Sequence, residues 1–209
     1  MEVFGLPKGT SAPAAELLTA RVVHTDLPRI GAISLPNVSA EGDNTSGTSD
    51  ILNKIHRAAI NSQLSNSFSI PTDCPTRERL GFMGDAMFAS QGMMYSFDAL
   101  RFYESFLRSV RDEQLKTCLN QPVLKGPCTA GAFNGSVPDV TPMSNQAGPN
   151  FPGSTVWQSA YVVIVRHLWR HYGPVALPVL REHYGGLRQF VGYLQTVADN
   201  STGLVMLGG

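Results

Sequence analysis

The chain has 209 residues, of which 43% are apolar, and it carries 16 basic and 16 acidic side chains. This length suits one ordinary domain, and the balanced charge supplies no positive field for a polyanion, so the composition argues against a nucleic-acid binder. The most apolar run, residues 156–169, is interrupted by polar side chains and is shorter than the roughly 20 apolar residues of a membrane span, so no membrane partner is expected. The amino terminus lacks a signal-peptide pattern, which leaves the compartment open.

The first predicted elements are two short strands, residues 18–25 and 32–35, separated by turn-forming residues such as Pro28 and Gly31. An isolated pair of strands buries too little apolar surface to be stable, so these strands are expected to be the tail of a larger β unit. Residues 36–49 are rich in small polar side chains and predict a linker.

The rest of the chain has mainly helical periodicity. Ser49 or Asp50 caps the first helix, which is expected to run to about residue 66 with Ile51 and Ile55 on its apolar face. Further helices are predicted over 85–97, 98–116, 154–171, 175–183 and 186–197, with a turn at 200–203. A set of methionines is interpreted as core filling rather than as soft metal ligands: Met83, Met87, Met93 and Met94.

Residues 118–153 form a loop too rich in glycine and proline for a helix. Loops longer than roughly 12–15 residues are uncommon in compact domains and are usually functional. The spacing of Cys74, Cys118 and Cys128 matches no zinc-ligand pair, whereas one disulfide between Cys118 and Cys128 is compatible with it.

Charge is concentrated in residues 73–85, which hold three carboxylates and two arginines in a chain that is only 15% charged. Pro71 and Pro75 keep the residues before them extended, which predicts a stiff loop. A group of carboxylates in a pocket suits general acid–base chemistry, because like charges and desolvation raise the pKa of one carboxyl until it donates a proton near neutrality.

Glu78 is the best candidate for this general acid. The adjacent Arg77 and Arg79 would favour its ionised form if their guanidinium groups lay close. The hypothesis therefore has both arginines pointing away from Glu78, while Asp73 and Asp85 approach it and accept hydrogen bonds from substrate hydroxyls. The alternative is that the arginines and Glu78 form surface ion pairs at a helix start, with Asp85 as a helix-terminal carboxylate.

Cys74 offers a second alternative, as a nucleophile activated by His56. No motif brings the two residues together, so a buried structural thiol is the favoured interpretation of Cys74.

A resemblance to a known family is carried by residues 69–85, which read S-I-P-T-D-C-P-T-R-E-R-L-G-F-M-G-D. This run closely resembles the signature of bacterial-type α-L-rhamnosidases, glycoside hydrolase family 78. Agreement continues in residues 22–26, 52–55 and 137–142, and at Trp157. The resemblance implies a mainly α fold, a toroid of six α/α hairpins whose first half would be residues 50–209. Residues 1–35 would then be the last strands of a β-sandwich domain, and 36–49 the linker.

By motif position, the resemblance implies that Glu78 is the general acid that protonates the glycosidic oxygen. Asp73 and Asp85 would hold rhamnose hydroxyls, and Arg77 would line the same pocket. Phe82 stands where relatives often have Trp, and its ring would pack on an apolar face of the sugar.

Trp157 matches an aromatic residue that lines the family's pocket. The family usually continues Trp-x-Asp, whereas this chain has Ser159 at the last position, which leaves the substrate preference open.

The family inverts at the anomeric carbon, which requires a second carboxylate roughly 6.5–9.5 Å from the acid. In the family this base comes from later hairpins, and the chain is expected to end about halfway around the toroid without it. Glu104, Glu113 and Glu182 lie in predicted helices without a supporting motif.

The expected partners are rhamnose-containing glycosides or polysaccharides, and the resemblance implies no cofactor and no catalytic metal. Two rival interpretations remain: a non-catalytic carbohydrate-binding protein or inactive fragment of the same fold, and a glycosidase or lyase of another family on a six-hairpin fold.

Overall fold

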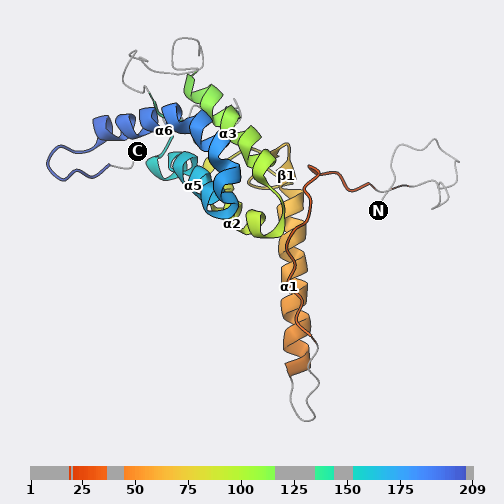
Figure 1. Ribbon diagram of the computed structural model, residues 1–209. Coiled ribbons are helices and arrows are strands. Elements are labelled where there is room, and N and C mark those ends of the chain that lie inside the picture. Colours follow the sequence, from red (N-terminus) through yellow and green to blue (C-terminus); the bar gives the residue numbers. More distant parts are fainter. Residues whose placement is uncertain (1–18, 20, 37–44, 116–134, 144–152, 206–209) are drawn as a thin grey trace, which may run out of the picture.

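The computed structural model describes residues 19, 21–36, 45–115, 135–143 and 153–205. The described part is mainly helical, as predicted, with one minimal hairpin (Figure 1). In chain order the elements are α1 (Thr45–Ser65), β1 (Ser67–Phe68), β2 (Ile70–Pro71), α2 (Met83–Ser96), α3 (Leu100–Leu115), α4 (Thr155–Gln158), α5 (Ala160–Tyr172), the 3-10 helix η3 (Gly173–Ala176) and α6 (Leu177–Val197).

The core lies between α2, α3, α5 and α6, which gather into one group while α1 extends away from them (Figure 1). The apolar stripe predicted for 98–116 faces this core, and Tyr103, Phe106 and Leu107 on α3 are fully buried. All four methionines proposed as core filling are buried in the same cluster, so that interpretation is confirmed. Among the described helices, none is both long enough and apolar enough to cross a membrane.

The apolar face expected for the first helix does not point into this core. Ile51 and Ile55 are 56% and 58% exposed, whereas Ile60 near the other end of α1 is 6% exposed. The reason is that α1 touches the described core only through its carboxyl-terminal part, where Leu64 packs against buried residues.

Residues 21–36 do not form the two predicted strands. They run extended beside α1 (Figure 1), where Asn53 both accepts the Leu35 N–H and donates to the Leu35 carbonyl at 2.9 Å. Nearer the core, Arg29 makes an isolated antiparallel bridge with Phe97. A strand needs a neighbouring strand for its backbone groups, and here helix side chains and a helix end supply the partners instead. The assignment of residues 1–35 to a β-sandwich remains a prediction.

The predicted helix over 154–171 is two helices, α4 and α5, separated at Ser159. The Ser159 hydroxyl donates to the Val156 carbonyl at 2.5 Å, a local bond that competes with regular helix geometry. The turn predicted at 200–203 is present, with Gly203 at a φ of 68°. Cys118 and Cys128 lie outside the described residues.

The two helices predicted over 175–183 and 186–197 are one, α6, which continues through Gly185 and Gly186. Gly186 is buried beneath α3 and α5, and its carbonyl accepts a hydrogen bond from the Gln114 side chain at 3.0 Å. A Cβ atom at this position would lie 2.5 Å from the Tyr161 hydroxyl. The glycine therefore permits a close approach of helices, and this packing offsets its low helix propensity.

Gly186→Ala and Gly185→Ala are expected to change stability in opposite directions. The Cβ at residue 186 would clash with the hydroxyl of Tyr161, whose side chain is fully buried, and should lower the free energy of unfolding by about 1–3 kcal/mol. The Cβ at residue 185 meets nothing within 4 Å and should raise it by about 0.5–1 kcal/mol. Urea unfolding of both variants tests this, and a neutral Gly186→Ala would contradict the close-packing account.

Candidate active site

The charged loop is tied down where it begins. It follows the β1–β2 hairpin, in which Phe68 pairs with Ile70 around Ser69 at a φ of 67°. The extended amino-terminal segment braces this hairpin, because the Thr25 side chain accepts the Ser69 N–H at 2.8 Å. The loop therefore starts from a fixed position.

Asp73 closes the loop that carries Glu78. Its backbone N–H donates to the Leu80 carbonyl at 3.0 Å, and its Oδ1 accepts the Leu80 N–H at 3.0 Å. Inside this closed loop, the Glu78 N–H donates to the Cys74 sulfur at 3.1 Å, and the sulfur lies 3.7 Å from the Glu78 Oε2. One carboxylate oxygen of Asp73, the Cys74 sulfur and one carboxylate oxygen of Glu78 all lie within 4.8 Å of one another. Asp73 thus lies close to Glu78, whereas the expected approach of Asp85 to Glu78 stays a prediction.

Asp73 and Asp85 have opposite electrostatic environments. Burial opposes ionisation of Asp73, but hydrogen bonds from the Cys74 and Glu78 side chains and from the Leu80 N–H outweigh it and lower the pKa of Asp73 to about 2. Asp85 lies in the first turn of α2, where burial, followed by the charge of Asp73, raises its pKa. The cluster therefore contains one carboxylate, that of Asp73, whose ionised form is favoured.

The two arginines beside Glu78 behave differently. Arg79 points away, and its guanidinium donates to the Thr76 carbonyl at 3.4 Å. Arg77 does not point away as predicted, because its Nη2 lies 3.2 Å from the Glu78 Oε1. The Arg77 side chain is 81% exposed, and exposed ion pairs contribute only about 0–1 kcal/mol, so a ligand can displace this contact. The surface ion pair of the alternative interpretation is present, although it lies in a turn before α2 rather than at a helix start.

Trp157, from a distant part of the sequence, packs against the start of α2 just after the charged loop. Its indole lies directly over Gly84, where a Cβ atom would be 2.5 Å from the ring. Gly84 immediately precedes Asp85 in α2, so the indole packs on the first turn of the helix that carries this carboxylate. Phe82 is half-buried just before α2 and pairs with Val140 in an isolated bridge.

Asp139 is a structural member of the site to which the sequence analysis assigned no role. Its carbonyl accepts the Met83 N–H at 2.8 Å, and its Oδ1 accepts the Ser154 N–H at 2.7 Å. Burial raises the pKa of Asp139, and the opposing hydrogen bonds from Ser154 only partly offset this rise. This one residue therefore joins the start of α2 to the start of α4, which carries Trp157. The only sequence signal was its place in the segment 137–142.

Ser159 does not substitute for the carboxylate of the family pattern. Its hydroxyl donates to the carbonyl of Val156 within the same helical turn and lies 3.6 Å from the Met87 sulfur. The hydroxyl of Ser159 is thus engaged in contacts within α4 and with Met87 on α2.

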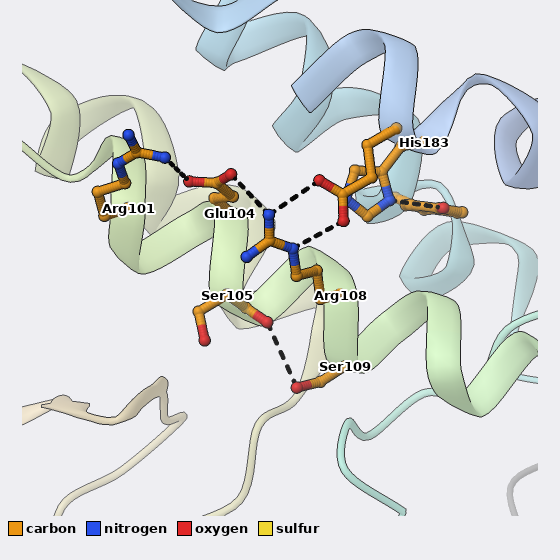
Figure 2. Close-up of polar contacts among 8 residues, drawn as sticks. Arg101, Glu104, Ser105, Arg108, Ser109 and His183 are labelled. Atoms are coloured by element: carbon orange, nitrogen blue, oxygen red, sulfur yellow. Dashed lines mark hydrogen bonds and ion pairs between the residues drawn. The ribbon is translucent and has the colours of Figure 1, made fainter. Parts of the chain in front are cut away.

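Two of the remaining acidic candidates are held by arginines. Arg108 binds both Glu104 at 2.9 Å and Glu182 at 2.7 Å, and so connects α3 to α6 (Figure 2). Arg101 adds a second contact to Glu104 at 2.6 Å. The hydrogen bond from Arg108 lowers the pKa of Glu182. This network serves helix packing.

The other sequence candidates also have partners of their own. Glu113 is buried on α3 and accepts the Met143 N–H at 3.3 Å. His56 accepts the Ile33 N–H at 3.4 Å on α1, whereas Cys74 contacts Glu78, so the structure gives no support to a Cys74–His56 pair.

Asp73, Cys74 and Glu78 are also the group in the described residues whose spacing could hold a metal ion. Two carboxylates and a thiolate would suit zinc. In this structure the Cys74 thiol donates to the Glu78 carboxylate, Asp73 accepts the Leu80 N–H, and the Arg77 guanidinium beside Glu78 disfavours a cation.

Comparison with known proteins finds a matching family model and several similar proteins. Residues 44–206 match the family model described as the bacterial alpha-L-rhamnosidase 6 hairpin glycosidase domain. An alpha-L-rhamnosidase of Formosa agariphila is 31% identical over 120 residues, which cover 56% of this chain and 11% of that protein. One of Alteromonas sp. is 27% identical over 210 residues, which cover 100% of this chain and 19% of that protein.

Solved structures of alpha-L-rhamnosidases resemble this chain as well. An alpha-L-rhamnosidase from Dictyoglumus thermophilum superposes with a TM-score of 0.67 at 33% identity, covering 91% of this chain and 18% of that one. The alpha-L-rhamnosidase of Streptomyces avermitilis, complexed with L-rhamnose, superposes with a TM-score of 0.64 at 27% identity. The match covers 86% of this chain and 14% of that one. The expected six-hairpin fold class is confirmed, and the chain spans less than a fifth of the length of these relatives.

Asp139→Ala is expected to loosen the start of α4, whereas Asp139→Asn should largely preserve it. Alanine leaves the half-buried Ser154 N–H without its acceptor, which should cost about 1–3 kcal/mol of unfolding free energy, while asparagine retains an acceptor oxygen. In a Trp169→Phe background, the emission of Trp157 should shift to longer wavelength in the alanine variant alone. Equal effects of both substitutions would contradict a role based on this hydrogen bond.

Proposed function

The chain belongs to the bacterial α-L-rhamnosidase six-hairpin glycosidase family, and from this membership we propose that the protein carrying it is a glycoside hydrolase that removes terminal α-L-rhamnose from rhamnosides. The observation that carries the proposal is the cluster of Glu78 with Asp73 and Cys74 in the closed loop 73–80. This cluster places the Glu78 carboxyl beside Asp73, a carboxylate whose pKa is lowered to about 2.

In this mechanism Glu78 is the general acid. It gives its proton to the glycosidic oxygen as the bond to the sugar breaks, so that the aglycone leaves as a neutral alcohol. The Glu78 side chain is 41% exposed, which lets a substrate oxygen approach it.

Asp73 and Asp85 are proposed to bind the hydroxyl groups of rhamnose. Asp73 is suited to this because its low pKa keeps it an acceptor over the working pH range. Arg77 is proposed to exchange its exposed contact with Glu78 for a sugar oxygen, and this exchange removes the positive charge that favours the ionised acid.

The aromatic side chains are proposed to bind the apolar faces of the sugar. The Trp157 indole packs on Gly84, the residue before Asp85 in α2, and Phe82 immediately precedes the same helix. An aromatic face and an adjacent carboxylate together suit a sugar ring, which offers C–H groups on one side and hydroxyls at its edge.

We place the general base of an inverting reaction outside the described residues. An inverting site needs a second carboxylate roughly 6.5–9.5 Å from the acid, with room for a water molecule. The engagement of Glu104 and Glu182 with arginines supports this placement, since neither is available to activate water.

The substrate class is tested with the full-length protein that carries this chain. It should release 4-nitrophenol from 4-nitrophenyl α-L-rhamnoside and not from other 4-nitrophenyl glycosides, and proton NMR should detect β-rhamnose first if the reaction inverts. Cleavage of a different sugar alone would refute the rhamnose assignment. Binding of rhamnose without turnover would favour the non-catalytic alternative.

The role of Glu78 is tested by Glu78→Gln, with Asp50→Asn as control because Asp50 pairs with Lys54 on the exposed part of α1. Loss of a general acid should lower kcat/KM by about 10²–10⁴-fold on substrates with poor leaving groups. The fall in rate on the alkaline side of the wild-type pH profile, where the acid loses its proton, should also disappear. Undiminished activity of Glu78→Gln would overturn the assignment.

A further inference from the structure

We propose that Cys74 is a positioning residue that holds the carboxyl group of Glu78 in the orientation needed for proton transfer. The inference rests on the proposed function, because it assigns to Cys74 a task only if Glu78 is the acid. It gives the thiol neither a nucleophilic role nor a covalent step.

The geometry that carries this inference is a double contact between the two residues. The Cys74 sulfur accepts the backbone N–H of Glu78 at 3.1 Å, and its S–H points to the Glu78 Oε2 at 3.7 Å. A thiol is a weak donor and a weak acceptor, yet here one atom holds both the backbone and the carboxyl of the same residue. The side chain of Glu78 is thereby fixed at its two ends.

The sulfur itself is held firmly. Pro75 keeps Cys74 extended, and the paired bonds between Asp73 and Leu80 close the backbone around it. The sulfur also lies within 4.8 Å of an Asp73 carboxylate oxygen. Because the sulfur is fixed, its contact with Oε2 can restrain the position of the Glu78 carboxyl.

Glu78 needs such a restraint because Arg77 attracts its other oxygen. The Arg77 guanidinium lies 3.2 Å from Oε1, and its side chain is 81% exposed, so it can draw the carboxylate toward solvent. The contact from Cys74 to Oε2 opposes this movement and keeps the carboxyl beside Asp73. When the thiol is removed, the acid should occupy its productive orientation less often.

The experiment exploits the fact that a good leaving group departs without help from an acid. In the full-length protein, Cys74→Ala should lower kcat/KM for phenyl α-L-rhamnoside at least about tenfold more than for 2,4-dinitrophenyl α-L-rhamnoside. Cys74→Ser, whose hydroxyl donates and accepts like the thiol, should recover most of this difference. The ratio of the two substrates on one preparation is independent of the fraction of folded enzyme, so partial misfolding cannot produce the result.

Thr76→Ala is the matched control, because Thr76 is exposed in the same turn and offers its backbone carbonyl rather than its side chain to Arg79. Its substrate ratio should equal that of the wild type. A Cys74→Ala ratio that also equals the wild-type ratio, in an enzyme that cleaves both rhamnosides, would overturn the positioning role and leave the proposed function intact. A wild-type protein that cleaves neither rhamnoside, or a Glu78→Gln variant without the leaving-group effect, would instead overturn the proposed function or the acid assignment.

Discussion

The paired hydrogen bonds between Asp73 and Leu80 are the constraint on which the candidate site depends. They close the loop in which Cys74 holds Glu78, and they help to keep Asp73 ionised. A backbone loop of this kind would otherwise sample many conformations, at a cost of roughly 1–2 kcal/mol for each residue that is ordered. Closing it before the substrate arrives means that this cost is met on folding and not on binding.

The start of α2 is the second organising feature, because three distant segments meet there. Asp139 ties the loop after α3 to both α2 and α4, and Trp157 lies on the bare backbone at Gly84. The core between α2, α3, α5 and α6 holds these ends in register, and the arginine network between α3 and α6 adds polar contacts at its edge (Figure 2). Packing away from the charged loop therefore sets where the Trp157 indole lies against α2.

Much of the helical architecture could be predicted from local pattern, since the stripe that includes Tyr103 and Phe106 repeats with the period of a helix and is buried as expected. The errors share one cause. The sequence predicts a helix break near Gly186, but α6 continues there because neighbouring helices pack closely on this glycine. The sequence also predicts that Ile51 is buried, whereas the described core does not reach it. In both cases a non-local contact, or the lack of one in the described part, outweighs a local preference of about 1 kcal/mol or less.

The sequence by itself determined the chemistry of the site: a stiff, proline-bounded loop with Glu78 between carboxylates, in a motif specific enough to indicate the family. Only the tertiary structure decided which of these groups touch. The structure brings the Arg77 guanidinium to Glu78 instead of away from it and gives Cys74 two contacts with Glu78. It also makes Asp139 the link between the starts of α2 and α4. The physical reason is that residue order fixes which groups are near in the chain, whereas the direction of a side chain follows from the closure of the loop and the packing of helices around it.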